Sequence, residues 1–343
     1  MIDQIRVLMI TSEWPTPEYP HYVPFLVRQV EFLRRAGVSV DVFSFRGAKK
    51  PINYLRAWKR LRRQIKNRDY DLLHAQFGQS ALLPWPKRLP LVVTFHGCDI
   101  QGVKGPDGHP TLAGRFLQRM CQLIAIRADA VIAVSERLRR FVPAARPVSV
   151  LPLGLDFDLV PVMSREEARR QLDLPLTERL VLFVGNPEET VKRYGLARRA
   201  VEILNEKLSA TLIVGWRRSN REILLLMTAC DVLVLTSIQE GSPTVVKEAL
   251  ACNLPVVSLD VGDVRQRLEG IAGCEVCGDE QAQTIATSLE RVLRIRERIN
   301  GREAIADLDE RLLTQKLIRI YKSVLSRNAY RETVGPDHMV QPG

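Results

Sequence analysis

Two apolar patterns alternate along this chain of 343 residues. Short, continuous, β-branched runs predict buried strands, and the segments between them carry apolar residues at helical spacing. In the first half the strand-like runs cover residues 6–12, 38–45, 71–76, 91–97, 130–135 and 148–154. In the second half they cover residues 181–185, 211–215, 231–237 and 255–260. Apolar strands separated by helices are typical of parallel sheets that helices cover on both faces.

The scheme occurs twice, which predicts an α/β protein of two doubly wound, Rossmann-like domains facing each other across a cleft. We expect an N-terminal domain over residues 1–155 and a C-terminal domain over 156–310. A helix over 311–330 is expected to pack back on the N-terminal domain, and the tail 331–343 is expected to be disordered. Ligands of such sheets bind at the carboxyl ends of the strands, so the cleft is the expected site.

The net charge of +11 is concentrated in one segment. Residues Arg46–Arg68 hold ten Lys and Arg and no acid, while Tyr54, Trp58, Leu61 and Ile65 recur at helical spacing. This pattern predicts a basic amphipathic helix. It is either a solvated surface helix or a contact for an anionic membrane surface or another polyanion. No recognition motif accompanies the charge, so nucleic acid is not an expected partner.

Other features narrow the class of protein. No apolar run approaches the roughly 20 residues that a membrane span needs, and the first residues read as a strand rather than a signal peptide. Six scattered cysteines suit a reducing compartment, and we interpret the lone Cys274–Cys277 pair as ordinary thiols. We therefore expect a cytoplasmic protein, at the inner face of the membrane if the basic helix binds lipid. No GxGxxG follows the first strand and no phosphate-binding GxxxxGK[ST] occurs, which disfavours dehydrogenases and P-loop NTPases.

Two carboxylates frame a predicted helix start in QEGSPTVVKEALACNLPVV, residues 239–257. Ser242 is a candidate cap and Pro243 a suitable first helical residue. The free backbone N–H groups of the first turn would then form an anion site. Glu240 lies beside this start, and Glu248 lies about 7–8 Å further along the helix.

That arrangement suits a nucleotide sugar. Phosphates would lie on the amides, one carboxylate would accept a ribose diol, and the other would bind the transferred sugar. The alternative is a capped helix with a solvated Glu248 and a loop Glu240.

The segment EGSPTVVKEAL resembles the E-x7-E signature of retaining, GT-B-fold glycosyltransferases of family 4 (glycosyl transferases group 1). In the first half GVSVDVFSF, DLLHAQFG, VVTFHGCD, ADAVIAVSE and VSVLPLGLD are also similar to that family. In the second half VLFVGN, VKRYG, LIVG and VGDVRQRLEG are similar to it. The resemblance covers residues 5–325 with its pieces in order.

The resemblance implies a role for each residue of the donor site. Glu248 would bind the ribose diol, and Glu240 would contact the transferred sugar near its reacting carbon. Lys192 would bind the leaving diphosphate, and Gly185 is also expected to contact the donor. Arg193 is a candidate substitute for an arginine that the family usually carries directly after Gly185. The diphosphate would also contact backbone amides, those of Gly241, Ser242, Thr244 and Val245.

On the N-terminal side His96 matches the family's TxH(G/D) position, beside the anomeric carbon. We expect His96, Glu240 and Lys192 to be the catalytic residues. Asp99, Arg28 and His21 are candidates for the acceptor side. The first loop departs from the family, because His21 or Val23 stands where glycine is usual and where the backbone approaches the donor phosphates.

The implied reaction moves a sugar from a UDP- or GDP-sugar to a glycan, lipid-linked or small-molecule acceptor, with retention. The expected partners are therefore a nucleotide sugar and such an acceptor. No cofactor and no metal are expected, because cationic side chains and helix amides would stabilise the diphosphate and no DxD pair stands out. Two alternatives stay open: a nucleotide-sugar epimerase of the same architecture, and a binding homologue that has lost catalysis.

Overall fold

The computed structural model describes residues 4–47, 50–103, 105, 109, 111–144 and 147–334. Within them two parallel sheets form, with strand orders β2-β1-β3-β4-β5-β6 and β11-β10-β9-β7-β8. The first sheet consists of β1 Arg6–Thr11, β2 Ser39–Ser44, β3 Leu72–Gln76, β4 Leu91–Phe95, β5 Ala130–Ala133 and β6 Val148–Val150. The second consists of β7 Leu180–Val184, β8 Thr211–Gly215, β9 Val232–Leu235, β10 Val256–Ser258 and β11 Glu275–Val276.

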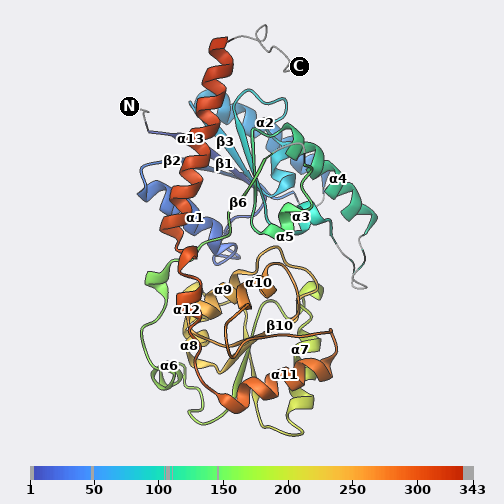
Figure 1. The fold of residues 1–343 in the computed structure, drawn as a ribbon. Coiled ribbons are helices and arrows are strands. Elements are labelled where there is room, and N and C mark those ends of the chain that lie inside the picture. Colours follow the sequence, from blue (N-terminus) through green and yellow to red (C-terminus); the bar gives the residue numbers. More distant parts are fainter. Residues whose placement is uncertain are drawn as a thin grey trace, which may run out of the picture.

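Helices connect the strands in both halves (Figure 1). The N-terminal half contains α1 Pro24–Arg35, α2 Pro51–Asn67, η1 Gly78–Leu82, α3 Cys98–Gln101, α4 Leu112–Arg127 and α5 Glu136–Arg139. The C-terminal half begins with η2 Phe157–Leu159, α6 Arg165–Gln171, η3 Thr190–Lys192, α7 Tyr194–Leu204, α8 Asn220–Ala229 and α9 Thr244–Ala251. It ends with α10 Val264–Leu268, α11 Ala282–Ile295, α12 Gly301–Ala304, η4 Ala306–Leu308 and α13 Glu310–Val334.

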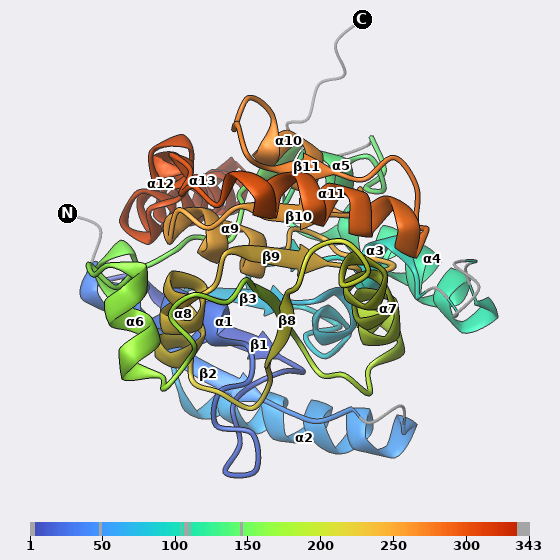
Figure 2. The same cartoon turned by 90° about the horizontal axis from the view of Figure 1, so that it is seen from below.

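Alternate residues of each strand pack on opposite faces of its sheet. In β1, Leu8 and Ile10 join the core under α2 and α4, whereas Val7 and Met9 join the core that includes α1 and α13. The second sheet is covered in the same way, by α8 and α9 on one side and by α7 and α11 on the other (Figure 2). These layers confirm the two Rossmann-like sheets predicted from the apolar runs.

The chain passes from one half to the other at Leu155 and returns at Asp309, where the two segments lie side by side. The Leu155 N–H donates to the Leu308 carbonyl at 2.9 Å, and the Glu310 N–H donates to the Leu155 carbonyl at 2.9 Å. Helix α13 then runs along the N-terminal half and packs on α1 (Figure 1). The expected disordered tail lies mostly outside the described residues, because these end at residue 334.

A buried histidine ties α13 to the first sheet. His74 of β3 is hydrogen-bonded to the Tyr321 hydroxyl at 2.6 Å and to Thr94 Oγ1 at 2.7 Å. Both His74 and Tyr321 are fully buried. His74 therefore has a structural role.

The basic segment forms α2, confirming the predicted amphipathic helix. Ala57 and Leu61 are buried, and Tyr54, Trp58 and Ile65 pack against the same core. Short β11 was not predicted, because its two residues carry no apolar run of their own.

Candidate active site

In each sheet the chain adds strands first on one side of a central strand and then on the other. The central strands are β1 in the first sheet and β7 in the second. In the first sheet the chain leaves β1 for β2 on one side, while β3 lies on the other. In the second sheet β7 lies between β8 and β9 in the same way. The crevice outside such a switch point is the usual ligand site of open parallel sheets. The loops that follow β1, β3, β7 and β9 therefore define where the site is expected.

The loop after β9 leads into α9, whose first turn has no side-chain cap. Pro243 is the residue before the helix, so α9 starts one residue later than the sequence predicts. Ser242 does not cap the helix, which corrects that prediction: its hydroxyl donates to Asp263 Oδ2 at 2.7 Å. Among the described residues, no side chain caps the N–H groups of the first turn of α9, which include those of Thr244 and Val245.

Glu248 lies on the first turns of α9 and is buried. Its Oε1 accepts a hydrogen bond from Asn220 Nδ2 at 3.0 Å, at the start of α8. Burial raises the pKa of Glu248, while Arg28, Asn220 and Lys247 act in the opposite direction. An ionised carboxylate offers about four acceptor positions, so one amide partner leaves it able to accept further donors.

Glu240 and Lys192 form an ion pair between the loop after β9 and the turn after β7. Lys192 Nζ lies 2.7 Å from Glu240 Oε1. Burial acts to lower the pKa of Lys192, but the Glu240 carboxylate outweighs it and holds the pKa above its usual value. Gly185 has φ +149°, and a Cβ there would touch the Lys192 side chain. The structure thus brings together three residues that the sequence assigned to the donor.

Arg193 follows Lys192 but points elsewhere. Its Nε donates to the Thr236 carbonyl at 2.8 Å, and its Nη1 pairs with Glu280 at 2.6 Å. The Arg193 backbone is in the left-handed region, with φ 50°. The structure therefore gives Arg193 a local structural role and does not place it beside Glu240 as a second cation.

His96 begins the loop after β4, on the N-terminal side of the cleft. Its Nε2 lies 2.7 Å from Gln76 Oε1, and its ring packs against Phe77 and Phe25 with centroids 4.4 and 5.4 Å away. Burial lowers the pKa of His96 to about 3, and the nearby His74 and Lys247 act in the same direction. His96 is therefore neutral at ordinary pH.

Asp99 is buried under the same loop and does not face an acceptor. Its carboxylate accepts the backbone N–H groups of Gly78, His96, Gly97 and Ile100 at 2.9–3.2 Å. Burial raises the pKa of Asp99, and these four hydrogen bonds act against that rise. The structure corrects its expected acceptor role: Asp99 shapes the loop that carries His96.

The other two acceptor-side candidates differ in exposure. Arg28 is buried, and its Nη2 donates to the Gly154 carbonyl at 2.6 Å while Glu310 lies 3.7 Å from its Nε. It therefore stabilises the joint between the two halves, which corrects its expected acceptor role. His21 is exposed in the loop after β1. Val23 has φ 44° and ψ 55°, so the backbone keeps a left-handed conformation at the place where the family usually has glycine.

The two halves touch directly at Gly241. A Cβ on this glycine would overlap the His96 carbonyl oxygen, and Gly97 packs against the Gly241 backbone. The Ser135 hydroxyl donates to the Gly241 carbonyl at 2.9 Å, and Gln239 Nε2 lies 2.7 Å from Gln101 Oε1. The loop that carries His96 is thereby held against the loop that carries Glu240.

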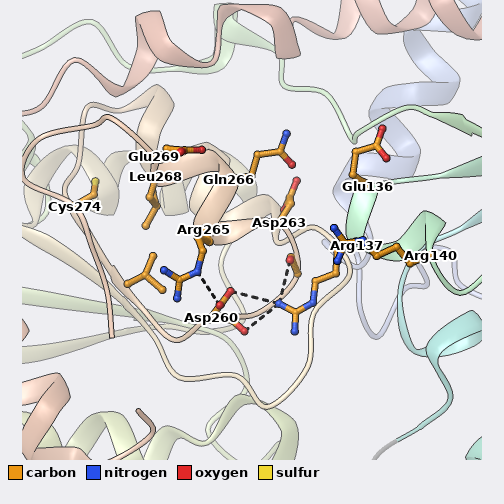
Figure 3. Close-up of a pocket in the computed structure, with 12 residues that line it drawn as sticks. Glu136, Arg137, Arg140, Asp260, Asp263, Arg265, Gln266, Leu268, Glu269 and Cys274 are labelled. Carbon is orange, nitrogen blue, oxygen red and sulfur yellow. Dashed lines mark hydrogen bonds and ion pairs between the residues drawn. The ribbon is translucent and has the colours of Figure 1, made fainter. Parts of the chain in front are cut away.

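Cavities lie at both edges of this contact. A cavity of about 1210 Å³ opens between the loops after β1, β2, β7 and β8, and its aromatic lining consists of Trp14, Tyr19, Tyr22, Phe45, Tyr54 and Trp216. At the opposite edge of the sheets a cavity of about 810 Å³ lies between α5 and α10 (Figure 3). There Arg137 pairs with Asp260 across the two halves at 3.4 Å. In Figure 3 the Asp260 carboxylate pairs with Arg137 and also with Arg265.

Three residues near the site carried no sequence signal that we recognised. Gln76 and Asn220 hydrogen-bond His96 and Glu248, but a lone amide beside a strand or a helix start is common. Glu13 lines the aromatic cavity, and burial raises its pKa to about 6. A polar residue at the end of a buried strand, such as Gln76, is the one feature that could have drawn attention.

Solved structures share this architecture. The chain superposes on a sucrose-phosphate synthase from Thermosynechococcus elongatus with a TM-score of 0.75 and 18% identity, covering 94% of this chain and 100% of that one. It superposes on Anabaena Alr3699/HepE in complex with UDP and glucose with a TM-score of 0.68 and 17% identity, covering 93% and 100%. The fold is that of a GT-B glycosyltransferase.

The family follows from the sequence comparisons. A family model described as Glycosyltransferase Family 4 matches residues 3–159, and one described as Glycosyl transferases group 1 matches residues 178–294. The chain belongs to this group of family 4 glycosyltransferases.

Curated relatives agree with that assignment. The chain is 28% identical to the putative teichuronic acid biosynthesis glycosyltransferase TuaC of Bacillus subtilis (strain 168), over 76% of this chain and 82% of that protein. It is 27% identical to the D-inositol 3-phosphate glycosyltransferase of Mycobacterium tuberculosis (strain F11), over 78% of this chain and 64% of that protein. The match thus spans less than two thirds of the mycobacterial relative.

None of the helices in the described part of the chain is both long enough and apolar enough to cross a membrane. Among the described residues, no group of three or more His, Cys, Asp or Glu side chains is placed to hold a metal ion. Cys274 and Cys277 are free thiols.

Proposed function

We propose that this glycosyltransferase moves a sugar from a nucleotide-diphospho sugar, with UDP or GDP as the leaving group, to a glycan, lipid-linked or small-molecule acceptor. Retention at the anomeric carbon is part of the proposal. The observation that carries it is the meeting of Glu240, Lys192 and the uncapped start of α9 beneath His96.

The donor's place follows from the charges. The free N–H groups at the start of α9 and the Lys192 ammonium are suited to the diphosphate. Glu248, further along the helix, accepts the ribose hydroxyls with the positions that Asn220 leaves. Glu240 is then next to the transferred sugar. Lys192 stays protonated at neutral pH because its pKa is raised, so it can stabilise the charge that develops as the glycosidic bond breaks.

Metal independence is also proposed. The group that faces Glu240 is a lysine, whose fixed charge suits a leaving diphosphate and competes with a cation for the same carboxylate. Activity measured after exhaustive treatment with a chelator should equal untreated activity. A requirement for added Mg²⁺ or Mn²⁺ would overturn this part of the proposal.

The relatives suggest which donors and which class of acceptor to test first. Anabaena HepE is solved in complex with UDP-glucose, which supports testing UDP-sugars first. TuaC is named for teichuronic acid biosynthesis, which supports a cell-envelope polysaccharide as the product class. A panel of UDP- and GDP-sugars, assayed for release of the nucleoside diphosphate, tests the donor. The anomeric configuration of the isolated product, read by NMR coupling constants, tests retention.

The two alternatives have distinct products. An epimerase would convert or hydrolyse the nucleotide sugar without an acceptor, which mass spectrometry of the products would detect. A homologue without catalysis would bind a nucleotide sugar and release no nucleoside diphosphate with any acceptor. Wild-type protein that binds no nucleotide sugar would contradict the proposal altogether.

We also propose that the outer surface of α2 contacts an anionic bilayer. Its exposed cations are Arg56, Lys59, Arg60, Arg63 and Lys66, and the exposed apolar Ile52 and Leu55 lie in its first turns. Helix α4 packs on the same face of the first sheet and exposes 84% of Leu112 and 72% of Phe116. Cations beside exposed apolar side chains are typical of interfacial helices.

Vesicle binding tests this surface. Co-sedimentation with vesicles rich in anionic lipid should fall with added salt and with reversal of Arg56, Lys59 and Arg63. Arg62 is a matched control, because its Nη2 is already engaged with the Pro86 carbonyl at 2.6 Å. Equal binding by the reversed variant and the wild type would refute the membrane contact.

A further inference from the structure

The hydrogen-bond partners of His96 determine which of its ring nitrogens carries the proton. His96 Nε2 lies 2.7 Å from the side-chain oxygen of Gln76. The amide nitrogen of Gln76 donates to Gln29 Oε1 at 2.9 Å and lies 3.9 Å from Met9 Sδ. A thioether sulfur accepts and cannot donate, so the nitrogen of the Gln76 amide, and not its oxygen, faces Met9.

This orientation leaves His96 one tautomer. The Gln76 oxygen accepts only, so the neutral ring must carry its proton on Nε2. Its Nδ1 is then a bare acceptor. That atom is buried and has no hydrogen-bond partner among the described residues. Buried polar atoms in native proteins nearly always have a partner, so an unpaired one calls for an explanation.

The position of His96 suggests what pairs with its Nδ1. The His96 carbonyl contacts Gly241, directly after Glu240, so the loop that carries His96 covers the proposed sugar position. Sugars present hydroxyl donors to such an acceptor. We propose that Gln76 and Gln29 are positioning residues that hold His96 in the Nε2–H tautomer, so that Nδ1 accepts a hydrogen bond from a hydroxyl of the transferred sugar. This inference rests on the proposed donor site.

The surroundings keep the ring neutral. His74 of β3 and Lys247 of α9 act against a positive charge on His96, and burial lowers its pKa to about 3. The rings of Phe77 and Phe25 cover it, and the buried Asp99 carboxylate is engaged with backbone N–H groups, including that of His96 itself. His96 therefore acts as a hydrogen-bond acceptor, and it does not transfer a proton over the ordinary pH range.

Nitrogen NMR of the full chain tests the tautomer directly. Long-range ¹H–¹⁵N spectra of protein labelled at its five histidines separate protonated from bare ring nitrogens. The His96 signals are identified by their loss in His96→Gln. We expect a neutral His96 with a bare Nδ1 from about pH 8 to about pH 5. A proton on Nδ1, or an imidazolium, in the wild type would overturn the proposal.

Variants of Gln76 link the tautomer to activity. Gln76→Glu keeps the shape but adds a negative charge, which raises the pKa of His96 and gives kcat/KM an acidic limb that the wild type lacks. Gln76→Met removes the acceptor and should lower kcat/KM about tenfold, because one neutral hydrogen bond is lost. Affinity for the nucleoside diphosphate alone, which has no sugar, should stay unchanged. The exposed Gln315→Glu on α13 is the control for added charge.

The outcomes separate this inference from the function on which it rests. Unchanged spectra and an unchanged pH profile in Gln76→Glu would refute the positioning role. If the Gln76 variants fail to fold, the half-buried Gln29 can be replaced instead. Gln29→Met is expected to release the Gln76 amide, so that His96 becomes a mixture of its two neutral tautomers. If no donor yields nucleoside diphosphate, the proposed function fails, while the spectra still report on the tautomer.

Discussion

Asp99 and Glu248 are buried carboxylates on opposite sides of the cleft, and burial raises the pKa of both. Their partners differ. Asp99 accepts four backbone N–H groups, whereas Glu248 has one side-chain hydrogen bond, from Asn220. Both belong to motifs that the sequence assigned to the site. The comparison teaches that a motif carboxylate is free for a ligand only where the fold leaves its acceptor positions unfilled.

The largest effect is expected at Glu248. Glu248→Ala should weaken donor binding about 10³-fold, because hydrogen bonds from a ribose diol to a charged acceptor are each worth about 1.5–3 kcal/mol. The folding stability of this variant should change little, because the substitution removes a carboxylate whose burial is itself unfavourable. Calorimetric titration with a UDP-sugar measures the affinity. Undiminished affinity would mean that Glu248 is a structural group like Asp99.

Asp99→Asn is the matched substitution on the other side. It places an N–H₂ group where four N–H donors need an acceptor, so stability should fall by about 2–4 kcal/mol. At temperatures where the variant stays folded, its affinity for the donor should be close to that of the wild type. Thermal unfolding and the same titration measure the two quantities. A large loss of affinity in a stable Asp99→Asn protein would reverse the comparison.

Glu240→Gln should reduce turnover more than binding. The change removes the charge that faces Lys192 and the proposed sugar, and single electrostatic contacts of this kind contribute about 10²-fold to kcat. Affinity for the nucleoside diphosphate should remain within a few fold. Single-turnover kinetics with the donor identified in the panel measure the step. Wild-type turnover in Glu240→Gln would exclude its role.

Gly241→Ala should hinder the contact between the two halves. The added methyl group would meet the His96 carbonyl, so we expect about a tenfold loss of kcat/KM from displaced loops. Gly195→Ala is the control, because nothing lies within 4 Å of a Cβ there. Small-angle scattering of both variants reports the separation of the halves. Equal activity in the two variants would show that the contact at Gly241 is dispensable.

The last prediction concerns the pH dependence of folding stability. Burial raises the pKa of Glu310 to about 7 from its ordinary 4.5. The unfolded chain therefore loses this proton at lower pH than the folded chain, and the folded state loses stability as pH rises through that window. Relative to the wild type, Glu310→Gln should gain roughly 3 kcal/mol between pH 4.5 and pH 7. Urea unfolding at several pH values measures the difference, and parallel pH curves for the two proteins would contradict it.

The sheets were predictable because strands that are buried on both faces appear in the sequence as continuous apolar runs. The start of α9 was also predictable within one residue, since Pro243 restricts the local backbone. The residues that differed from expectation were fixed by distant partners. Ser242 bonds Asp263, and Arg193 bonds Glu280. Local sequence does not contain those partners, so it could not indicate which polar groups stay free.

The loop after β1 is the clearest case of this limit. Val23 or His21 stands where the family usually has glycine, yet Val23 keeps the left-handed conformation. A β-branched residue in that region is strained by roughly 1–2 kcal/mol. The buried position of the Val23 side chain offsets part of that cost. The packing around Val23, which the sequence does not show, therefore determines the backbone conformation of this loop.

The central claim is that the start of α9 holds a nucleotide sugar through Glu248. The most direct measurement is calorimetric titration of wild type, Glu248→Ala and Asp99→Asn with a UDP- or GDP-sugar that yields nucleoside diphosphate. We predict tight binding to the wild type, nearly equal binding to folded Asp99→Asn, and about 10³-fold weaker binding to Glu248→Ala. Equal affinities for Glu248→Ala and the wild type would contradict the claim.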